Sequence, residues 1–203
     1  MNETNKKPVK KEPKEPTSRD LQREKTKQVI YDSALKLFTE HNYDEVKMTD
    51  IAKASGVAVG SIYYHFRNKE AIVDFGYERF DEALQKEYDE VNPKPGRKGI
   101  DTLMRYHVAF VSSLDYRIVG ISYKSHIGAE NTFYLSKRRF LYRCLRKNLM
   151  AAGIKEENAD EVTDTFLRSI RGCIFDWCCY QGRYNLSDIF LEDLNILYHY
   201  YNI

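Results

Sequence analysis

Hydrophobic residues recur at helical spacing along most of this chain. Near its beginning, Ala34, Leu37 and Phe38 follow Ile30 at intervals of four, seven and eight residues. At about 100° per residue this spacing places all four side chains on one face of a helix. The first helix is therefore expected to begin near Asp20, with its apolar face against a core.

The same reasoning predicts helices in the rest of the chain. A short helix over about residues 49–55 precedes Gly56, which suits the left-handed residue at a helix end. The loop NPKPGRKG (92–99) is the clearest break, and Ser187 is the expected N-cap of the last helix. Further helices are expected near residues 59–66, 69–91, 100–115, 117–127, 132–151, 157–182 and 187–202. No strand alternation, repeat or sustained heptad interrupts this pattern, which predicts an all-α fold with about nine helices.

Composition supports helix and limits the possible partners. All five prolines lie before residue 96, and the formal net charge is only +2, so nucleic-acid binding would need a local surface. Residues 1–18, MNETNKKPVKKEPKEPTS, contain too few apolar side chains to fold, which predicts a disordered tail over residues 1–19. Without a membrane-length apolar stretch or a signal-peptide core, the expected location is the cytoplasm, with no membrane partner.

The four cysteines lack metal-binding spacing. Cys178 and Cys179 are adjacent, so on a helix they point about 100° apart and chelate poorly. We interpret Cys144, Cys173 and this pair as small buried hydrophobic residues, with a thiol redox sensor as the alternative. No metal site and no cofactor are predicted.

Residues 49–70 are predicted to form a short helix, a glycine turn and a second helix, which is the helix–turn–helix arrangement, and the second helix contains the row of aromatic residues in SGVAVGSIYYHFRNKEAI (55–72). Helical geometry puts Ile62, Phe66 and Val59 on the core side of its second helix. Tyr64 then points directly away from the core. Tyr63 and His65 lie on the two borders between these faces.

A helix in the major groove of DNA presents its outer face to base edges and its borders to phosphates. Tyr64 is therefore predicted to contact bases or sugars, and Tyr63 and His65 to contact phosphates. Lys69 would add a positive charge at the edge of this surface. Lys47 and Thr49 fit a phosphate contact and a solvated position equally well. The predicted set of DNA contacts is Lys47, Thr49, Val59, Gly60, Ser61, Tyr63, Tyr64, His65 and Lys69.

Residue by residue, this region resembles the N-terminal domain of the tetracycline-repressor (TetR) family. The matching positions are Asp50-Ile51-Ala52, Ser55-Gly56-Val57, Gly60, Ile62-Tyr63, His65-Phe66 and Lys69. The resemblance implies a three-helix DNA-binding domain over residues 20–70, followed by a larger ligand-binding and dimerisation domain over 71–203. It also implies that Tyr63, His65 and Lys69 hold the DNA backbone. Ala58 and Lys47 depart from the family, which usually has capping Ser and Thr there, so Thr49 is an alternative cap.

The remaining residues contain no nucleotide-binding loop, H-E-x-x-H or G-x-S-x-G motif, which argues against an enzyme with catalytic residues. Their many aromatic residues fit either a small-molecule pocket or an ordinary core. The TetR resemblance implies a pocket among the middle helices, for a small hydrophobic or aromatic effector. Its expected lining is Tyr106, Phe110, Tyr123, His126, Phe133 and Tyr134.

The last two predicted helices are unusually apolar, so something must cover them. Either they close the core of the monomer or they meet a second copy, and the resemblance implies a four-helix interface in a homodimer. The residues expected there are Phe166, Ile170, Gly172, Ile174, Trp177, Phe190, Leu194 and Leu197.

These features predict a homodimeric, ligand-responsive regulator, a repressor, that binds a palindromic operator in double-stranded DNA. One alternative is a constitutive or architectural DNA-binding protein without small-molecule control. Another is a helical interaction module whose helix–turn–helix no longer binds DNA.

Overall fold

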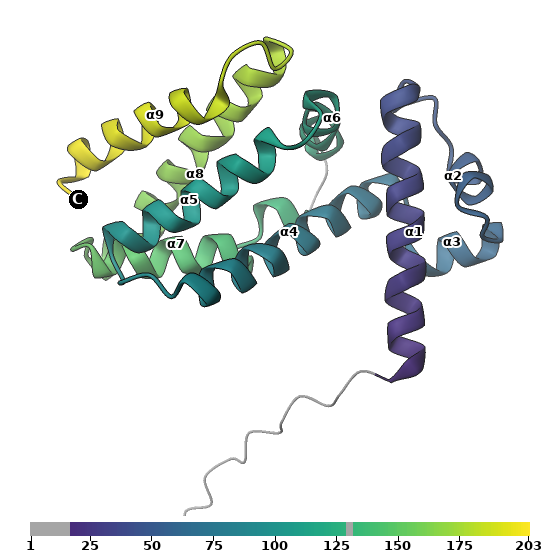
Figure 1. The fold of residues 1–203 in the computed structure, drawn as a ribbon, viewed down its shortest axis with the longest axis horizontal. Helices are drawn as coiled ribbons and strands as arrows, with labels where there is room; N and C mark the ends of the chain where they lie inside the picture. The colour runs from purple at the N-terminus through teal and green to yellow at the C-terminus, as the bar shows by residue number, and fades with distance from the viewer. Residues whose placement is uncertain (1–16, 129–131) are drawn as a thin grey trace, which may run out of the picture.

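The computed structural model describes residues 17–128 and 132–203, and in these ranges it contains nine α-helices and no strand (Figure 1). This confirms the predicted all-α fold. Most of the predicted tail, residues 1–16, lies outside the described residues. The helices are α1 (Ser18–Glu40), α2 (Met48–Ser55), α3 (Val59–His65), α4 (Lys69–Val91), α5 (Arg97–Ser112), α6 (Tyr116–His126), α7 (Phe140–Ala151), α8 (Glu156–Cys179) and α9 (Leu186–Tyr201), with a 3₁₀ turn, η1 (Phe133–Leu135).

Figure 1 shows α1, α2 and α3 at one end of the molecule and α5, α7, α8 and α9 at the other, with α4 leading between them. Two separate hydrophobic clusters match this arrangement. The first contains Ile30, Ile51 and Ile62 from α1, α2 and α3. α4 contributes Phe75 to the first cluster and Phe80 to the second, so the change of core occurs within α4. The expected domain division at residue 70 stays a prediction.

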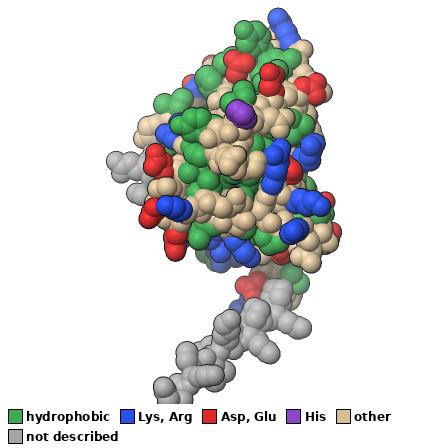
Figure 2. All heavy atoms as spheres, turned by 90° about the vertical axis from the view of Figure 1, so that its left-hand side faces the viewer, with side chains coloured by type: hydrophobic (Ala, Val, Ile, Leu, Met, Phe, Trp, Pro, Cys, Tyr) green, Lys and Arg blue, Asp and Glu red, His purple; other side chains and the backbone are tan. Residues whose placement is uncertain are grey.

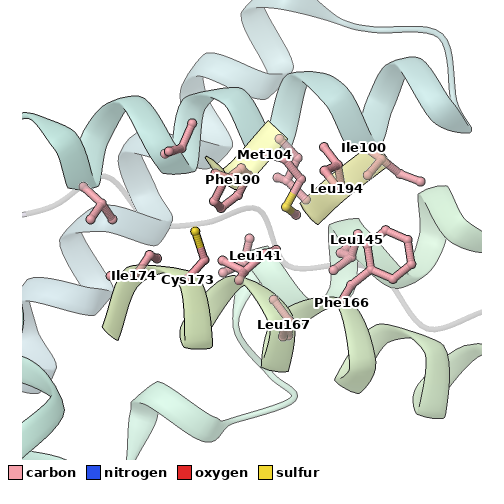
Figure 3. Close-up of a cluster of buried hydrophobic side chains, with 14 of the residues drawn as sticks. Ile100, Met104, Leu141, Leu145, Phe166, Leu167, Cys173, Ile174, Phe190 and Leu194 are labelled. Atoms are coloured by element: carbon pink, nitrogen blue, oxygen red, sulfur yellow. The ribbon is translucent and has the colours of Figure 1, made fainter. Parts of the chain in front are cut away.

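The second cluster holds the C-terminal helices together. Met104 of α5, Leu145 of α7, Phe166 of α8 and Phe190 of α9 are each 0–1% exposed. Figure 3 shows these side chains meeting between the helices. Burying side chains of this size stabilises the fold by about 1.5–3 kcal/mol each.

The predicted helix over residues 132–151 is wrong in its first half, where the chain instead forms η1 and begins α7 at Phe140. Asp81 of α4 explains this start. Its Oδ2 accepts a hydrogen bond from the backbone N–H of Phe140 at 2.8 Å, while its carboxylate pairs with the Arg139 side chain. A side chain distant in sequence thus satisfies the helix N-terminus, and local periodicity contains no trace of it.

Two smaller predictions also need correction. Asn185, not Ser187, caps α9, because its side chain accepts a hydrogen bond from the backbone N–H of Ser187 at 3.0 Å. The cysteines are free thiols, but only Cys144 and Cys173 are buried, whereas Cys178 is half-buried and Cys179 exposed. Of the helices in the described ranges, none has the length and apolar character needed to cross a membrane.

Candidate functional site

The helix–turn–helix is formed by α2 and α3 with Gly56 between them. Gly56 adopts the left-handed conformation (φ 69°), as its position predicts. Ile62 is fully buried and Phe66 is 4% exposed, so these two residues fix α3 on the core. Ala58 occupies the N-cap position of α3 and makes no side-chain capping hydrogen bond, so this helix start lacks a common source of stability.

The opposite face of α3 is open. Tyr64 is 71% exposed and Tyr63 is 53% exposed, although tyrosine rings are usually at least partly covered. Val59 is also exposed, so its predicted place on the core side is wrong. The helix begins at Val59, beyond the cluster, and Val57 packs against the cluster instead.

Basic side chains of α1 extend this surface. The guanidinium carbon of Arg23 lies 5.7 Å from the centroid of the Tyr64 ring, a cation–π contact. Burial, together with the nearby Arg23 and Lys27, lowers the pKa of His65, which favours its neutral form. The DNA contacts predicted from the sequence did not include these two residues.

The other predicted contacts differ in how they are held. Gly60, Lys47 and Thr49 are exposed and Ser61 is partly buried. The Lys69 ammonium lies 2.6 Å from the backbone oxygen of Tyr43, which accepts its hydrogen bond. Lys69 therefore ties α4 to the segment between α1 and α2, and its charge is partly used within the chain. Thr49 does not cap α2, whose N-cap residue is Lys47.

A cavity of about 90 Å³ lies between α1 and the helices that follow it. Phe110, Tyr123 and Tyr134 line it, as predicted for a pocket. Tyr31 and Leu35 of α1 also line it, so the helix that supports the helix–turn–helix forms part of the wall.

Three residues of the expected lining do not reach this cavity. Tyr106 lies one turn before Phe110 and packs against the second hydrophobic cluster. Phe133 lines a separate surface groove. His126 instead joins α6 to α4, with its Nε2 at 3.0 Å from Oδ1 of Asp74. Periodicity gives the face of a helix but not where along the helix a cavity lies.

The cavity wall also contains polar residues that sequence analysis missed. Arg139 and Arg171 line it together with His107. Burial, followed by the charges of Arg139 and Arg171, lowers the pKa of His107 to about 3, which keeps the imidazole neutral. No local pattern distinguishes Arg171, because Arg168 likewise follows a buried residue, Leu167, and is exposed.

Comparison with known proteins agrees with this architecture. Residues 30–74 match the family described as bacterial regulatory proteins, tetR family. The matched segment contains α2, α3 and most of the first hydrophobic cluster.

The segment over residues 30–74 belongs to the TetR family.

Two curated relatives are similar to this chain over longer segments. The biofilm operon negative transcriptional regulator IcaR of Staphylococcus epidermidis is 31% identical over 97 residues, which cover 46% of this chain and 49% of that protein. The HTH-type transcriptional repressor KstR2 of Rhodococcus jostii is 29% identical over 131 residues, covering 63% and 64%. The chain thus spans about half of the first relative and under two thirds of the second.

Solved structures share the TetR-family fold across more of the chain. FadR from Bacillus halodurans has a TM-score of 0.64 at 20% identity and covers 85% of this chain and 94% of its own. FadR from Thermus thermophilus, a transcriptional repressor solved with lauroyl-CoA, has a TM-score of 0.58 at 16% identity, covering 84% and 92%. The family is one of regulatory proteins, in agreement with the expectation that this chain is not an enzyme.

The residues expected at a dimer interface require a correction. Leu197 is partly buried and packs against the second cluster, and Gly172 alone is exposed. The other six are 0–6% exposed within the single chain and belong to its own core: Phe166, Ile170, Ile174, Trp177, Phe190 and Leu194. They face inward because α8 packs on α7 and α9 along that side.

Different apolar side chains lie on the outside of α8 and α9. Phe175 is 52% exposed, Ile196 is 60% exposed and Tyr200 is 77% exposed. Gly172 lies three residues before Phe175, and a Cβ there would meet nothing within 4 Å. Figure 2 views the end of the molecule that carries the C-terminus and shows charged side chains of both signs around hydrophobic ones.

Proposed function

We propose that this protein is a cytoplasmic, ligand-responsive transcriptional repressor that binds a palindromic operator in double-stranded DNA as a homodimer. The observation that carries the proposal is the open face of α3, where Tyr63 and Tyr64 lie exposed opposite the buried Ile62. This face has the form of a helix that enters the major groove. The names of IcaR and KstR2, a negative regulator and a repressor, support the direction of control.

In this proposal Tyr64 contacts base edges or sugars, with Gly60, Ser61 and Val59 beside it. Tyr63 and His65 hold the phosphates on either side, helped by Arg23 and Lys27 from α1. Lys47 and Thr49 at the start of α2 complete the contact surface. Lys69 contributes mainly by fixing the segment before α2, because its ammonium is bonded to the Tyr43 carbonyl.

The exposed face of α8 and α9, around Gly172, Phe175 and Ile196, is the proposed homodimer interface. Two copies joined there would place two α3 helices on successive half-sites of a palindrome. Gly172 would let the helix backbones approach closely, because it has no side chain to separate them.

Ligand control rests on the position of the cavity. Tyr31 and Leu35 of α1 form part of its wall. Contacts between α6 and the DNA-binding end add a second connection: Lys124 pairs with Asp44, and the Arg117 side chain donates to the backbone oxygen of Thr39. A small hydrophobic or aromatic effector that prefers one arrangement of these contacts would change operator affinity by that preference.

The proposal is tested by titrating the protein with its upstream DNA and with a random duplex, at one moderate salt concentration. Specific binding tighter by about a thousandfold or more is expected. Equal affinities would refute the repressor function, because non-specific phosphate contacts would then account for all the binding.

The small size of the cavity favours one alternative, a constitutive DNA-binding protein without an effector. A thermal-shift screen with small hydrophobic and aromatic compounds separates the two functions. A compound that raises Tm and also releases the operator supports ligand control, whereas specific DNA binding that no compound changes supports the alternative.

A further inference from the structure

The two arginines of the cavity wall have different surroundings. Arg139 is neutralised: its Nη2 lies 2.7 Å from Oδ1 of Asp81, and both side chains are at least 93% buried. Arg171 has no carboxylate within ion-pair distance among residues 17–128 and 132–203, and its guanidinium lies 4.9 Å from the centroid of the Tyr134 ring. Arg171 is partly buried, and a cation at the wall of a mainly apolar cavity is costly to desolvate unless an anion or several acceptors accompany it. The wall thus contains one positive charge without an anion.

Two further polar atoms of the wall are buried, the Tyr134 hydroxyl and Nδ1 of His107, and neither makes a hydrogen bond of normal geometry to the described residues. The Tyr134 hydroxyl nevertheless lies near the Tyr123 hydroxyl and the Arg171 guanidinium. By contrast, the neighbouring Tyr123 hydroxyl donates to the backbone oxygen of Arg171 at 3.0 Å, which positions that residue. Buried polar groups normally have partners, so those without one mark places that a ligand or water fills.

Together these groups match the chemistry of a carboxylate. A guanidinium donates two parallel N–H groups to the two oxygens of a carboxylate, and a tyrosine hydroxyl adds a third donor. Because the Tyr134 ring lies against the Arg171 guanidinium, its hydroxyl and this cation belong to the same part of the wall.

The rest of the wall sets the size and polarity of the ligand. Val73, Phe80, Phe110, Leu141 and Ile174 make it mainly apolar. At about 90 Å³ the cavity holds several times the space that one water needs, yet falls below the roughly 300–1,000 Å³ of a site for a drug-sized ligand. A long chain or a nucleotide-bearing ligand would not fit without enlarging it.

We propose that the cavity binds a small organic carboxylate with a compact aromatic or short aliphatic body. Its carboxylate lies on Arg171 and the Tyr134 hydroxyl, and its apolar body packs among the aromatic and aliphatic side chains of the wall. The binding itself depends only on the cavity, while its regulatory effect rests on the proposed function.

The test compares acids with uncharged and cationic analogues of the same shape. Benzoate, phenylacetate and hexanoate are added to the full chain at millimolar concentration, beside benzyl alcohol, benzylamine and lauroyl-CoA. The acids are expected to raise Tm, and the alcohol and the amine to leave it unchanged. Calorimetric titration of the best acid then gives its Kd.

Substitutions of Arg171 and Tyr134 test whether these two residues bind the acid. Arg171→Gln is expected to weaken the acid about 10- to 100-fold, the usual range for a charged hydrogen-bonding partner. Tyr134→Phe is expected to weaken it by several-fold. Arg168→Gln is the matched control, because Arg168 lies one turn earlier on α8 and is exposed. Circular dichroism and Tm without ligand show whether each variant is folded.

Several results would overturn the carboxylate site: equal shifts with acid and alcohol, a shift with lauroyl-CoA but none with any acid, no shift at all, or unchanged affinity in folded Arg171→Gln and Tyr134→Phe proteins. None of these affects specific operator binding, so failure of the site and failure of the proposed regulator are separate outcomes.

Discussion

The apolar stripes of α3 and of α8 are buried in different ways. α3 packs on the core through Ile62 and leaves its opposite side open, so helical geometry alone identifies Tyr64 as the outward residue. α8 is covered by α7 and α9, and its strongest apolar stripe lies inside the same chain. A stripe therefore tells which side chains are buried, but not whether their partner is the same molecule or a second one.

A pair of substitutions on α8 separates packing within one chain from packing between two chains. Phe166 is fully buried, so Phe166→Ala is expected to lower the free energy of unfolding by about 3–5 kcal/mol. Phe175 is 52% exposed, so Phe175→Ala should leave the stability of a single chain nearly unchanged and weaken the dimer. Urea unfolding and sedimentation equilibrium measure the two effects. A Phe166→Ala protein with native stability and loss of the dimer would restore the original assignment.

The burial of His107 also predicts that the stability of the fold depends on pH. The pKa of His107 falls from its ordinary value of 6.5 to about 3 in the folded chain. Below pH 6.5 the unfolded chain binds a proton that the folded chain does not, so stability falls as the pH is lowered toward 3. At pH 5 this loss reaches at most about 2 kcal/mol.

His107→Gln should remove this contribution, which comparison of urea unfolding at pH 7.5 and pH 5 detects. His199→Gln is the control, because His199 is exposed on α9. If His107→Gln lost as much stability as the native chain between these pH values, the imidazole would not be buried in the neutral form.

On the exposed face of α3, removal of one hydroxyl tests the proposed phosphate contact of Tyr63. Tyr63→Phe is expected to weaken binding to specific and random duplexes alike, by about 1 kcal/mol or roughly fivefold. Fluorescence anisotropy at fixed salt measures both affinities. Tyr180→Phe removes a hydroxyl from an exposed tyrosine beyond α8 and should change neither. A loss confined to the specific duplex would instead make Tyr63 a base contact.

The smallest expected effect concerns the start of α3. Ala58 has the extended backbone of an N-cap residue (φ −64°, ψ 146°) but no side-chain acceptor. Ala58→Ser should stabilise the chain by about 1 kcal/mol, because the hydroxyl oxygen can accept a hydrogen bond from the first turn. Thermal unfolding measures the gain. An unchanged or lower Tm would show that the first turn of α3 does not need this cap.

Structural features that depend on neighbouring residues were predictable from the sequence, and features that depend on residues distant in the chain were not. Helical period and Gly56 were enough to place α2, α3 and the outward Tyr64. The start of α7 depends on Asp81, 59 residues earlier in the chain, which no local pattern contains. The cavity forms where six helices meet, so its arginines and the absence of Tyr106 and His126 from its wall follow only from the packing.

The central claim is that the outer face of α3 reads DNA sequence through Tyr64, and the most direct test is selection of preferred duplexes from a random pool by native and Tyr64→Ala proteins. The account predicts that the variant still binds DNA but selects different or less restricted bases at the positions beneath α3. Identical preferred sequences for the two proteins would contradict it.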